Sequence, residues 1–389
     1  MVIRRPSRNR MFFAKCSAFM VAWLEITSAC LGQTQGPPKK KVDIEPNVVV
    51  IPLRGTVGIF KDDFDALPKR NQIPDFVTSD IVRGALDEAK KSKPEAVVLE
   101  ISGPGGDVDE MCFIVNMLMD EQDNGLRVIA WIGPDVISAD AEIALACKEL
   151  VAKSLCQIGA CVIWRHGVNG ERIDVRGKDG DPVARKMYAA LVAPVQQAQD
   201  KARRPRCVEE AMRVMEAELW WHPQKGLAAT IGKDDGWEQV DKANDVLMLS
   251  SEQLIKFGLA IGKADDETQL LKALELPATT KVRRLDGYMK IRRHNAAQKA
   301  LKSWQRIVDF LNAYKGIAES FEEAKSRPDT DARTRRALLV TCADQIRITK
   351  DMLDRLELNK ASKAPLHEQL DGLAKRIFQS ISEIDATNR

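Results

Sequence analysis

The sequence has few histidines, little excess charge and no close grouping of metal-binding side chains. Four histidines are scattered through 389 residues, and neither they nor the eight cysteines show the spacing of zinc ligands. A net charge of +3 is small for this length and does not indicate a nucleic-acid partner. We therefore expect no metal, no cofactor and no bound nucleic acid. The length allows two domains.

Long apolar runs are also missing. The longest candidate, residues 11–24, follows four arginines and precedes the small residues 27–29, which is the pattern of a secretory leader. Lys15 interrupts the run, and the remaining core is shorter than the roughly 20 residues of a spanning helix. We expect residues 1–32 to be a signal peptide and the mature chain to be exported, to a periplasmic or other extracytoplasmic location. An uncleaved leader would instead tether the chain peripherally to the membrane.

Residues 33–46 are rich in proline and lysine and are interpreted as a solvated linker.

Two of the cysteines fall in or beside the leader, and the even number that remains would permit disulfides in an exported chain. Cys112 and Cys147, however, lie on apolar helical patterns, where a free thiol is the usual state. Cysteine chemistry is therefore not the expected function.

Residues 47–277 alternate between strand and helix patterns. Apolar runs at 96–101 and 127–132 are typical of buried strands, and helical patterns cover 79–91 and 107–123. Strands alternating with helices favour right-handed parallel crossovers. We therefore predict an α/β domain built on a parallel sheet.

Residues 278–389 have a different composition. Glycine nearly disappears after Asp286, and apolar residues recur at steps of three and four in three stripes. The stripes are separated near 327–329 and 363–365, where prolines occur. This pattern predicts a three-helix bundle or a short coiled-coil-like module. Such stripes more often face a core than a partner protein.

Two segments of the first domain carry chemistry. Residues 101–106, Ile-Ser-Gly-Pro-Gly-Gly, directly follow one predicted strand, and residues 136–139, Val-Ile-Ser-Ala, follow the next. In each segment a strand ends in a turn and a helix begins, so backbone N–H groups are presented at a helix N-terminus. A serine needs a base to become a nucleophile, and the oxyanion it generates needs fixed donors. The two segments therefore suggest an oxyanion hole facing Ser138.

Five pieces in order resemble one family. They are the strand at 48–55, Pro104-Gly105-Gly106, Ser138 with its alanine-rich helix, residues 158–160 and the helix at 249–260. Together they resemble the ClpP/crotonase-like serine proteases, most closely the signal-peptide-peptidase-like and NfeD-associated branch. The resemblance implies a ClpP/crotonase-like domain, a peptide or protein substrate lying along a strand edge, and a homo-oligomer. NfeD-type relatives often continue into membrane helices, which the C-terminal sequence here does not show.

The resemblance also implies roles for individual residues. Ser138 would be the nucleophile, the amides of Gly105, Gly106 and Ala139 would bind the oxyanion, and Lys186 would be the general base. For a lysine to act as a base near neutral pH, its pKa has to fall from about 10.4 to about 7–8, and this requires removal of the amine from water. The apolar residues that follow Lys186 are consistent with this. The expected activity is therefore that of an exported serine endopeptidase that cleaves apolar, extended peptides through an acyl-enzyme.

Two alternatives for the base stay open. Lys186 has the position of an ordinary solvated lysine at a helix start, and most lysines are exposed. His166 could instead form a triad with Asp174 or Asp181. The turn-rich sequence around His166 is more typical of a surface loop.

One position departs from the family pattern. Relatives have glycine two residues after the nucleophile, whereas this chain has Asp140. An aspartate in the first turn of a helix stabilises that helix. If its carboxylate lay about 6 Å from the oxyanion, however, its charge would destabilise the oxyanion by roughly 3 kcal/mol at an effective dielectric constant near 20. A catalytically silent peptide-binding or scaffold protein is therefore an alternative function. A crotonase-type acyl-thioester enzyme, which shares the oxyanion hole, is a third.

Overall fold

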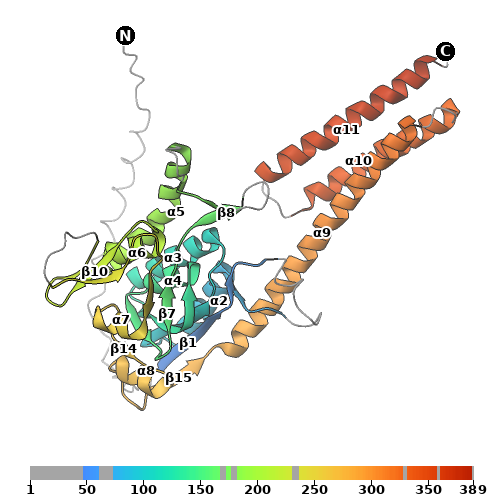
Figure 1. Ribbon diagram of the computed structural model, residues 1–389. Coiled ribbons are helices and arrows are strands. Elements are labelled where there is room, and N and C mark those ends of the chain that lie inside the picture. The colour runs from blue at the N-terminus through green and yellow to red at the C-terminus, as the bar shows by residue number, and fades with distance from the viewer. Residues whose placement is uncertain are drawn as a thin grey trace, which may run out of the picture. The chain divides into compact units, whose positions relative to one another are not determined.

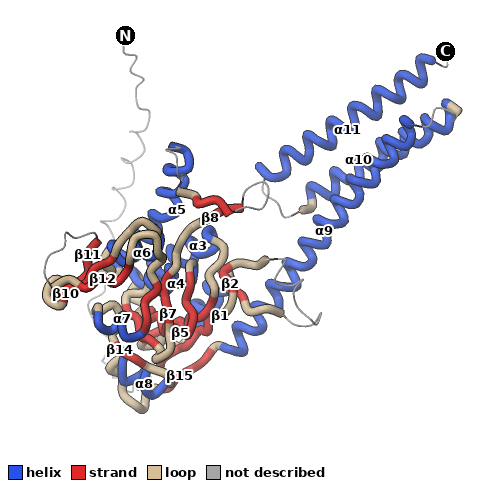
Figure 2. The backbone as a smooth tube through the Cα atoms, in the orientation of Figure 1, coloured by secondary structure: helices blue, strands red, loops and turns tan. Residues whose placement is uncertain are grey.

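The structure is a computed structural model that describes residues 47–60, 73–166, 172–176, 182–229, 236–326, 331–356 and 360–387 (Figures 1 and 2). These residues belong to one compact unit that begins at Glu45. The predicted signal peptide and linker lie outside the described residues and remain predictions.

A mostly parallel sheet forms the centre of the first domain. Its middle strands are β1 (Asn47–Arg54), β4 (Ala96–Gly103) and β5 (Val128–Ile137). Within the described residues it has eight strands, with β13-β7-β5-β4-β1-β15 as the main order, β6 beside β5 and β14 beside β6. Only the β13–β7 pair is antiparallel among the pairs of this sheet. The outer strands are β6 (Glu149–Ala152), β7 (Gln157–Gly159), β13 (Met248–Ser250), β14 (Gly262–Lys263) and β15 (Lys281–Arg284).

The strands are buried on both faces, as their continuous apolar sequences require. On β1, Val49 and Ile51 face one hydrophobic cluster, whereas Val48 and Val50 face another. Helices α2 (Ser79–Lys90), α3 (Val108–Asp123) and α4 (Ala139–Leu145) contribute to the first cluster. The second is closed by α8 (Glu267–Ala273). Further helices are α5 (Pro182–Lys201), α6 (Arg206–Arg213) and α7 (Ser251–Lys256).

Smaller sheets flank this core. β2 (Thr56–Val57) pairs in parallel with β3 (Phe76–Val77). β8 (Trp164–His166) and β9 (Arg172–Asp174) form an antiparallel ribbon where the sequence suggested turns. The third sheet contains β10 (Leu219–His222), β11 (Gly226–Ala229) and β12 (Glu238–Asp241).

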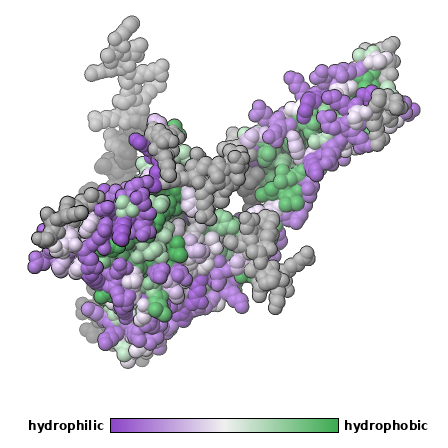
Figure 3. Space-filling model, viewed as in Figure 1, coloured by the Kyte–Doolittle hydropathy of each residue, from purple (hydrophilic) through white to green (hydrophobic). Residues whose placement is uncertain are grey.

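The C-terminal region is helical. α9 (Asp286–Ser326), α10 (Ala332–Asp354) and α11 (Lys360–Thr387) share one apolar cluster of their own. On the face shown in Figure 3, hydrophilic residues cover most of this module and hydrophobic ones gather in narrower patches, as expected for amphipathic helices. The prediction of an α/β parallel-sheet domain followed by an all-helical module is thus confirmed. No helix in the described part of the chain is long and apolar enough to cross a membrane.

Two details of the C-terminal region differ from the sequence expectation. Pro365 lies inside α11 rather than before it. β15, which follows residue 277, pairs in parallel with β1 and so belongs to the main sheet. The start of α9 also packs on this domain, because Met289 and Ala297 are buried in its core cluster.

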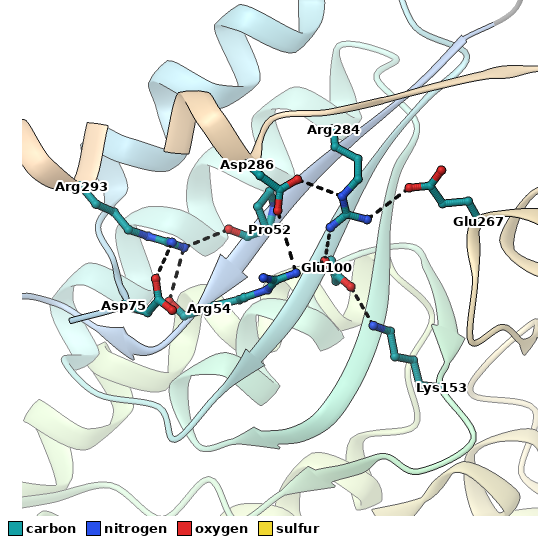
Figure 4. Close-up of polar contacts among 9 residues, drawn as sticks. All are labelled: Pro52, Arg54, Asp75, Glu100, Lys153, Glu267, Arg284, Asp286 and Arg293. Carbon is teal, nitrogen blue, oxygen red and sulfur yellow. Dashed lines mark hydrogen bonds and ion pairs between the residues drawn. The ribbon is translucent and has the colours of Figure 1, made fainter. Parts of the chain in front are cut away.

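Side chains from α9 and β15 bind the ends of the sheet strands (Figure 4). Arg293 of α9 donates to the carbonyls of Phe76 and Pro52 at 2.9 and 3.1 Å. It also forms an ion pair with Asp75 at 2.7 Å. The guanidinium thereby fixes the first helix of the module to the segments around β1 and β3.

Glu100 of β4 is the centre of a second polar cluster (Figure 4). It accepts from Lys153 at 2.7 Å, Arg284 at 2.5 Å and Arg54 at 2.9 Å. Burial alone would raise the pKa of Glu100, but these three cations outweigh it and lower the pKa to about 2. The ionised carboxylate therefore stabilises the fold above the pKa of an unfolded glutamate.

We predict that Glu100→Gln lowers the free energy of unfolding by about 3 kcal/mol at pH 7, because the variant loses the linkage of a carboxylate whose pKa falls from 4.5 to about 2. The difference from wild type should shrink as the pH falls from 4.5 toward 2. Urea unfolding at several pH values measures it. Glu238→Gln, which breaks an exposed pair with Lys256, is the control and should cost less than about 1 kcal/mol. A pH-independent difference for Glu100→Gln would contradict the prediction.

Candidate functional site

Ser138 lies at the junction of β5 and α4 in a strained backbone conformation. It is the N-cap residue of α4, with φ +56° and ψ −120°. Left-handed φ values are uncommon for residues other than glycine and cluster at functional sites. An N-cap serine usually accepts a hydrogen bond from the helix, but the Ser138 side chain makes no such bond. Its hydroxyl is therefore not used for capping.

The backbone around Ser138 is held by β7. The Ser138 N–H donates to the carbonyl of Gly159 at 2.8 Å. The residue after Gly159 is Ala160, and its N–H donates to the carbonyl of Leu247 at 3.0 Å. Ala160 also has a positive φ, +52°. Gly159 has no room for a side chain, because a Cβ there would lie 2.1 Å from the Leu247 oxygen. Residues 158–160, identified in the sequence, thus fix the backbone of the serine.

The glycine turn after β4 packs directly on the serine. Gly105 has φ +86°, and a Cβ on it would lie 2.5 Å from the Ser138 Cβ and 2.9 Å from the Ala139 nitrogen. Only glycine permits this approach. Ala139 is the first residue of α4, and the first N–H groups of a helix have no acceptor within it. The structure therefore brings Ser138, Ala139 and Gly105 together.

Gly106 completes the turn at the surface. It is exposed and has φ +152°, and a Cβ on it would lie 2.0 Å from the Val57 oxygen. Val57 of β2 holds the turn from both sides, donating to the Gly105 carbonyl at 2.9 Å and accepting from the Asp107 N–H at 2.7 Å. The Gly106 N–H itself forms no hydrogen bond with any residue that the structure describes.

Asp140 takes up one of the expected oxyanion donors. Its side chain is buried, with 1% of its surface exposed, and its Oδ2 accepts from the Gly105 N–H at 2.9 Å. Burial raises the pKa of Asp140 to about 7, although the Gly105 hydrogen bond acts in the opposite direction. The aspartate at position 140 therefore has a direct structural consequence at the predicted site.

Lys186 is exposed, and the structure shows no bond between it and the serine within the described residues. Lys186 lies on the first half of α5, and its neighbour Met187 is also 56% exposed. The backbone of His166 pairs with Arg172 in the β8–β9 ribbon. The His166 side chain lies outside the described part, as do those of its predicted partners Asp174 and Asp181.

A buried charged cluster behind α4 was not predicted from the sequence. Arg213 of α6 binds Glu142 of α4 at 2.7 Å and also pairs with Glu209. Gln199 of α5 donates to Glu142 at 2.8 Å. Burial lowers the pKa of Arg213, but the two carboxylates outweigh it and raise the pKa above its ordinary value. The cluster ties the helix that begins at Ser138 to α5 and α6. Its only sequence signal is a second acidic residue, Glu142, two positions after Asp140 in an α4 that is otherwise apolar.

Arg213→Met should lower the free energy of unfolding by about 3–5 kcal/mol, because it leaves two buried carboxylates without their cation. Chemical denaturation at pH 7 measures the change. The control is Arg206→Met on the same helix as Arg213, which removes an exposed pair with Asp200 of α5 and should cost less than about 1 kcal/mol. Equal effects of the two variants would show that the buried cluster does not stabilise the fold.

The Asp140 environment generates a prediction about pH. Between pH 4 and 7 the folded chain holds a proton on Asp140 that the unfolded chain releases, so wild-type stability falls as pH rises. Asp140→Asn removes this dependence. The stability of the variant relative to wild type should therefore rise by up to about 4 kcal/mol across that range and be constant above it. Urea unfolding at pH 4 to 8 tests this, and a constant difference would show that Asp140 titrates normally.

No family model matches the chain, and no curated protein matches it. Among solved structures, a variant of a membrane-bound stomatin-specific protease in complex with a substrate peptide is 20% identical, with a TM-score of 0.41 over 64% of this chain and 97% of that one. The Pyrococcus horikoshii protease specific for a stomatin homologue is 18% identical, with a TM-score of 0.33 over 62% and 92%. An enoyl-CoA hydratase from Thermoplasma volcanium is 13% identical, with a TM-score of 0.28 over 77% and 90%.

Proposed function

We propose that the chain is a serine endopeptidase that cleaves extended, apolar peptide segments, with Ser138 as nucleophile and Lys186 as general base. The observation that carries this proposal is the backbone of Ser138. A serine with φ +56° at a strand-to-helix junction, whose hydroxyl makes no capping bond, is held in a costly conformation with no evident structural use. The Ala139 N–H and the glycine turn lie beside it.

The proposed reaction follows from these groups. The Ser138 Oγ attacks the peptide carbonyl carbon while its proton passes to the Lys186 Nζ, and the carbonyl oxygen becomes an oxyanion. The N–H groups of Ala139 and of the Gly105-Gly106 turn stabilise that oxyanion. The C–N bond then breaks, the amine leaves with the proton from Lys186, and an ester to Ser138 remains. Water hydrolyses the ester in the second half of the reaction.

For this chemistry the Lys186 amine has to form a hydrogen bond with the Ser138 hydroxyl and lose its contact with water. Assembly into a homo-oligomer could remove this water. The exposed Met187 beside Lys186 supports such assembly, because a partner copy that covers this half of α5 would bury an apolar surface. Removing water from a lysine favours its neutral form, which can accept a proton. The proposal also includes export, and a membrane tether if the leader is retained.

A second candidate function is a catalytically silent peptide-binding or scaffold protein. It is favoured by one observation, the hydrogen bond between Asp140 and the Gly105 N–H. In such a protein the strand edges beside the glycine turn would bind an extended peptide without cleaving it, and the helical module would recruit a partner.

A fluorophosphonate probe on the purified full-length chain distinguishes the two functions. We expect an adduct on Ser138, located by mass spectrometry, and none in Ser138→Ala. Lys186→Ala should slow labelling at least about 100-fold, because a general base contributes that much or more. Lys201→Ala, on the same helix but paired with Asp123, is the matched control and should label like wild type.

A folded wild-type chain that does not label, beside a known serine peptidase that does, would favour the silent protein. Equal labelling of Lys186→Ala and wild type would remove Lys186 from the mechanism and leave His166 as the base to test.

A further inference from the structure

The Asp140 carboxylate binds the N–H of Gly105, one of the predicted oxyanion donors. An oxyanion-hole donor holds its oxygen at about 2.7–3.1 Å. Asp140 Oδ2 lies 2.9 Å from the Gly105 nitrogen, within that range. A substrate oxygen cannot use this N–H while the carboxylate oxygen remains on it.

The slot that holds the carboxylate is formed by glycines. A Cβ at Gly103 would lie 2.5 Å from Asp140 Oδ2 and 2.3 Å from the Gly55 oxygen. The Gly55 carbonyl alone already requires glycine at position 103, and this glycine also leaves the space that the aspartate occupies. The aspartate is packed in the interior and is therefore not an incidental surface substitution.

The charged groups on the elements around Asp140 are engaged elsewhere. Burial and the Gly105 N–H are the two influences that shift its pKa within the described residues. Glu142 of α4 is bound to Arg213, Glu100 of β4 to cations on the other face of the sheet, and Asp107 to the N-terminus of α3. Arg54, at the end of β1, pairs with Glu100. No described cation therefore neutralises the Asp140 carboxylate.

We propose that Asp140 is a proton-dependent positioning residue that determines whether the Gly105 N–H is available as an oxyanion donor. In the ionised state the carboxylate holds the N–H and the donor is blocked. In the protonated state the contact weakens and the donor is released. The catalytic consequence rests on the proposed function of Ser138, whereas the contact itself does not.

The physical basis is the difference between the two forms of one side chain. A hydrogen bond to a carboxylate is roughly twice as strong as one to a neutral acceptor, and an ionised Asp140 would also repel a developing oxyanion. A protonated acid near an oxyanion can even donate its O–H. Burial places the change between the two forms near neutral pH, since the Asp140 pKa is raised to about 7.

The contact can be observed directly, without activity. Pro104-Gly105 is the one Pro-Gly pair in the sequence, so a full-length chain labelled with carbonyl-¹³C proline and ¹⁵N glycine gives a single selected amide signal, that of Gly105. We expect its chemical shift to titrate with a midpoint near pH 7 in wild type and not in Asp140→Asn. The control is the Gly125 amide, in a turn with open space around it, which should not follow this titration. A second sample labelled with carbonyl-¹³C asparagine and ¹⁵N glycine selects it together with the other Asn-Gly amide. A Gly105 signal that is constant with pH, or that titrates equally in Asp140→Asn, would overturn the proposal.

The catalytic consequence is tested by the rate of Ser138 labelling in wild type and Asp140→Gly. At pH 8 we expect the variant to label about 100-fold faster, the usual effect of one oxyanion donor, and at pH 6 the ratio should approach one. Circular dichroism checks that the variant folds, and Asp140→Asn replaces it if it does not. Equal labelling rates at both pH values would refute the role of Asp140. If no variant labels while Gly105 still titrates, the peptidase proposal fails and the proton-dependent contact stands.

Discussion

The candidate site depends on the close approach of two backbone turns. The turn after β4 packs on the junction of β5 and α4 so tightly that Gly105 could carry no side chain. Parallel pairing of β4 with β5 places the ends of both strands at one edge of the sheet, and the hydrogen bonds of Val57 and Gly159 hold the two turns from outside. The strain at Ser138 persists because these surroundings determine its backbone. The strain at Ser138 and the contact of Asp140 with Gly105 both depend on that geometry.

The elements with strong periodicity could be predicted from the sequence. Strand 96–101 is observed as 96–103, and helix 107–123 as 108–123. The serine and the glycine turn could be paired in advance because each follows a buried strand, and strands that are consecutive in an α/β sheet usually lie side by side. Proline disfavours helix interiors, so the sequence predicts a boundary at Pro365, but the structure includes this residue in α11.

The features that the sequence did not predict depend on contacts between residues far apart in the chain. Arg213 meets Glu142 across 71 positions, and Arg293 reaches Pro52 across 241. No local pattern encodes such pairs, because each residue alone is an ordinary charged side chain. The sequence identified Asp140 as a departure and suggested a repulsive charge. The burial of its carboxylate and its bond to Gly105 follow only from the packing of α4 on the turn.

The pairing of β15 with β1 has a consequence for how the two regions of the chain can be separated. β15 comes after the apparent boundary of the first domain, yet it covers the edge of β1, the strand that leads to the Gly55 turn and β2. A chain ending near residue 277 would leave one edge of β1 unpaired at residues 47–50, and an exposed apolar edge is of the kind that recruits other strands and aggregates. The helical module and the sheet therefore share a strand, and evolution could exchange one region for another only together with residues 281–284.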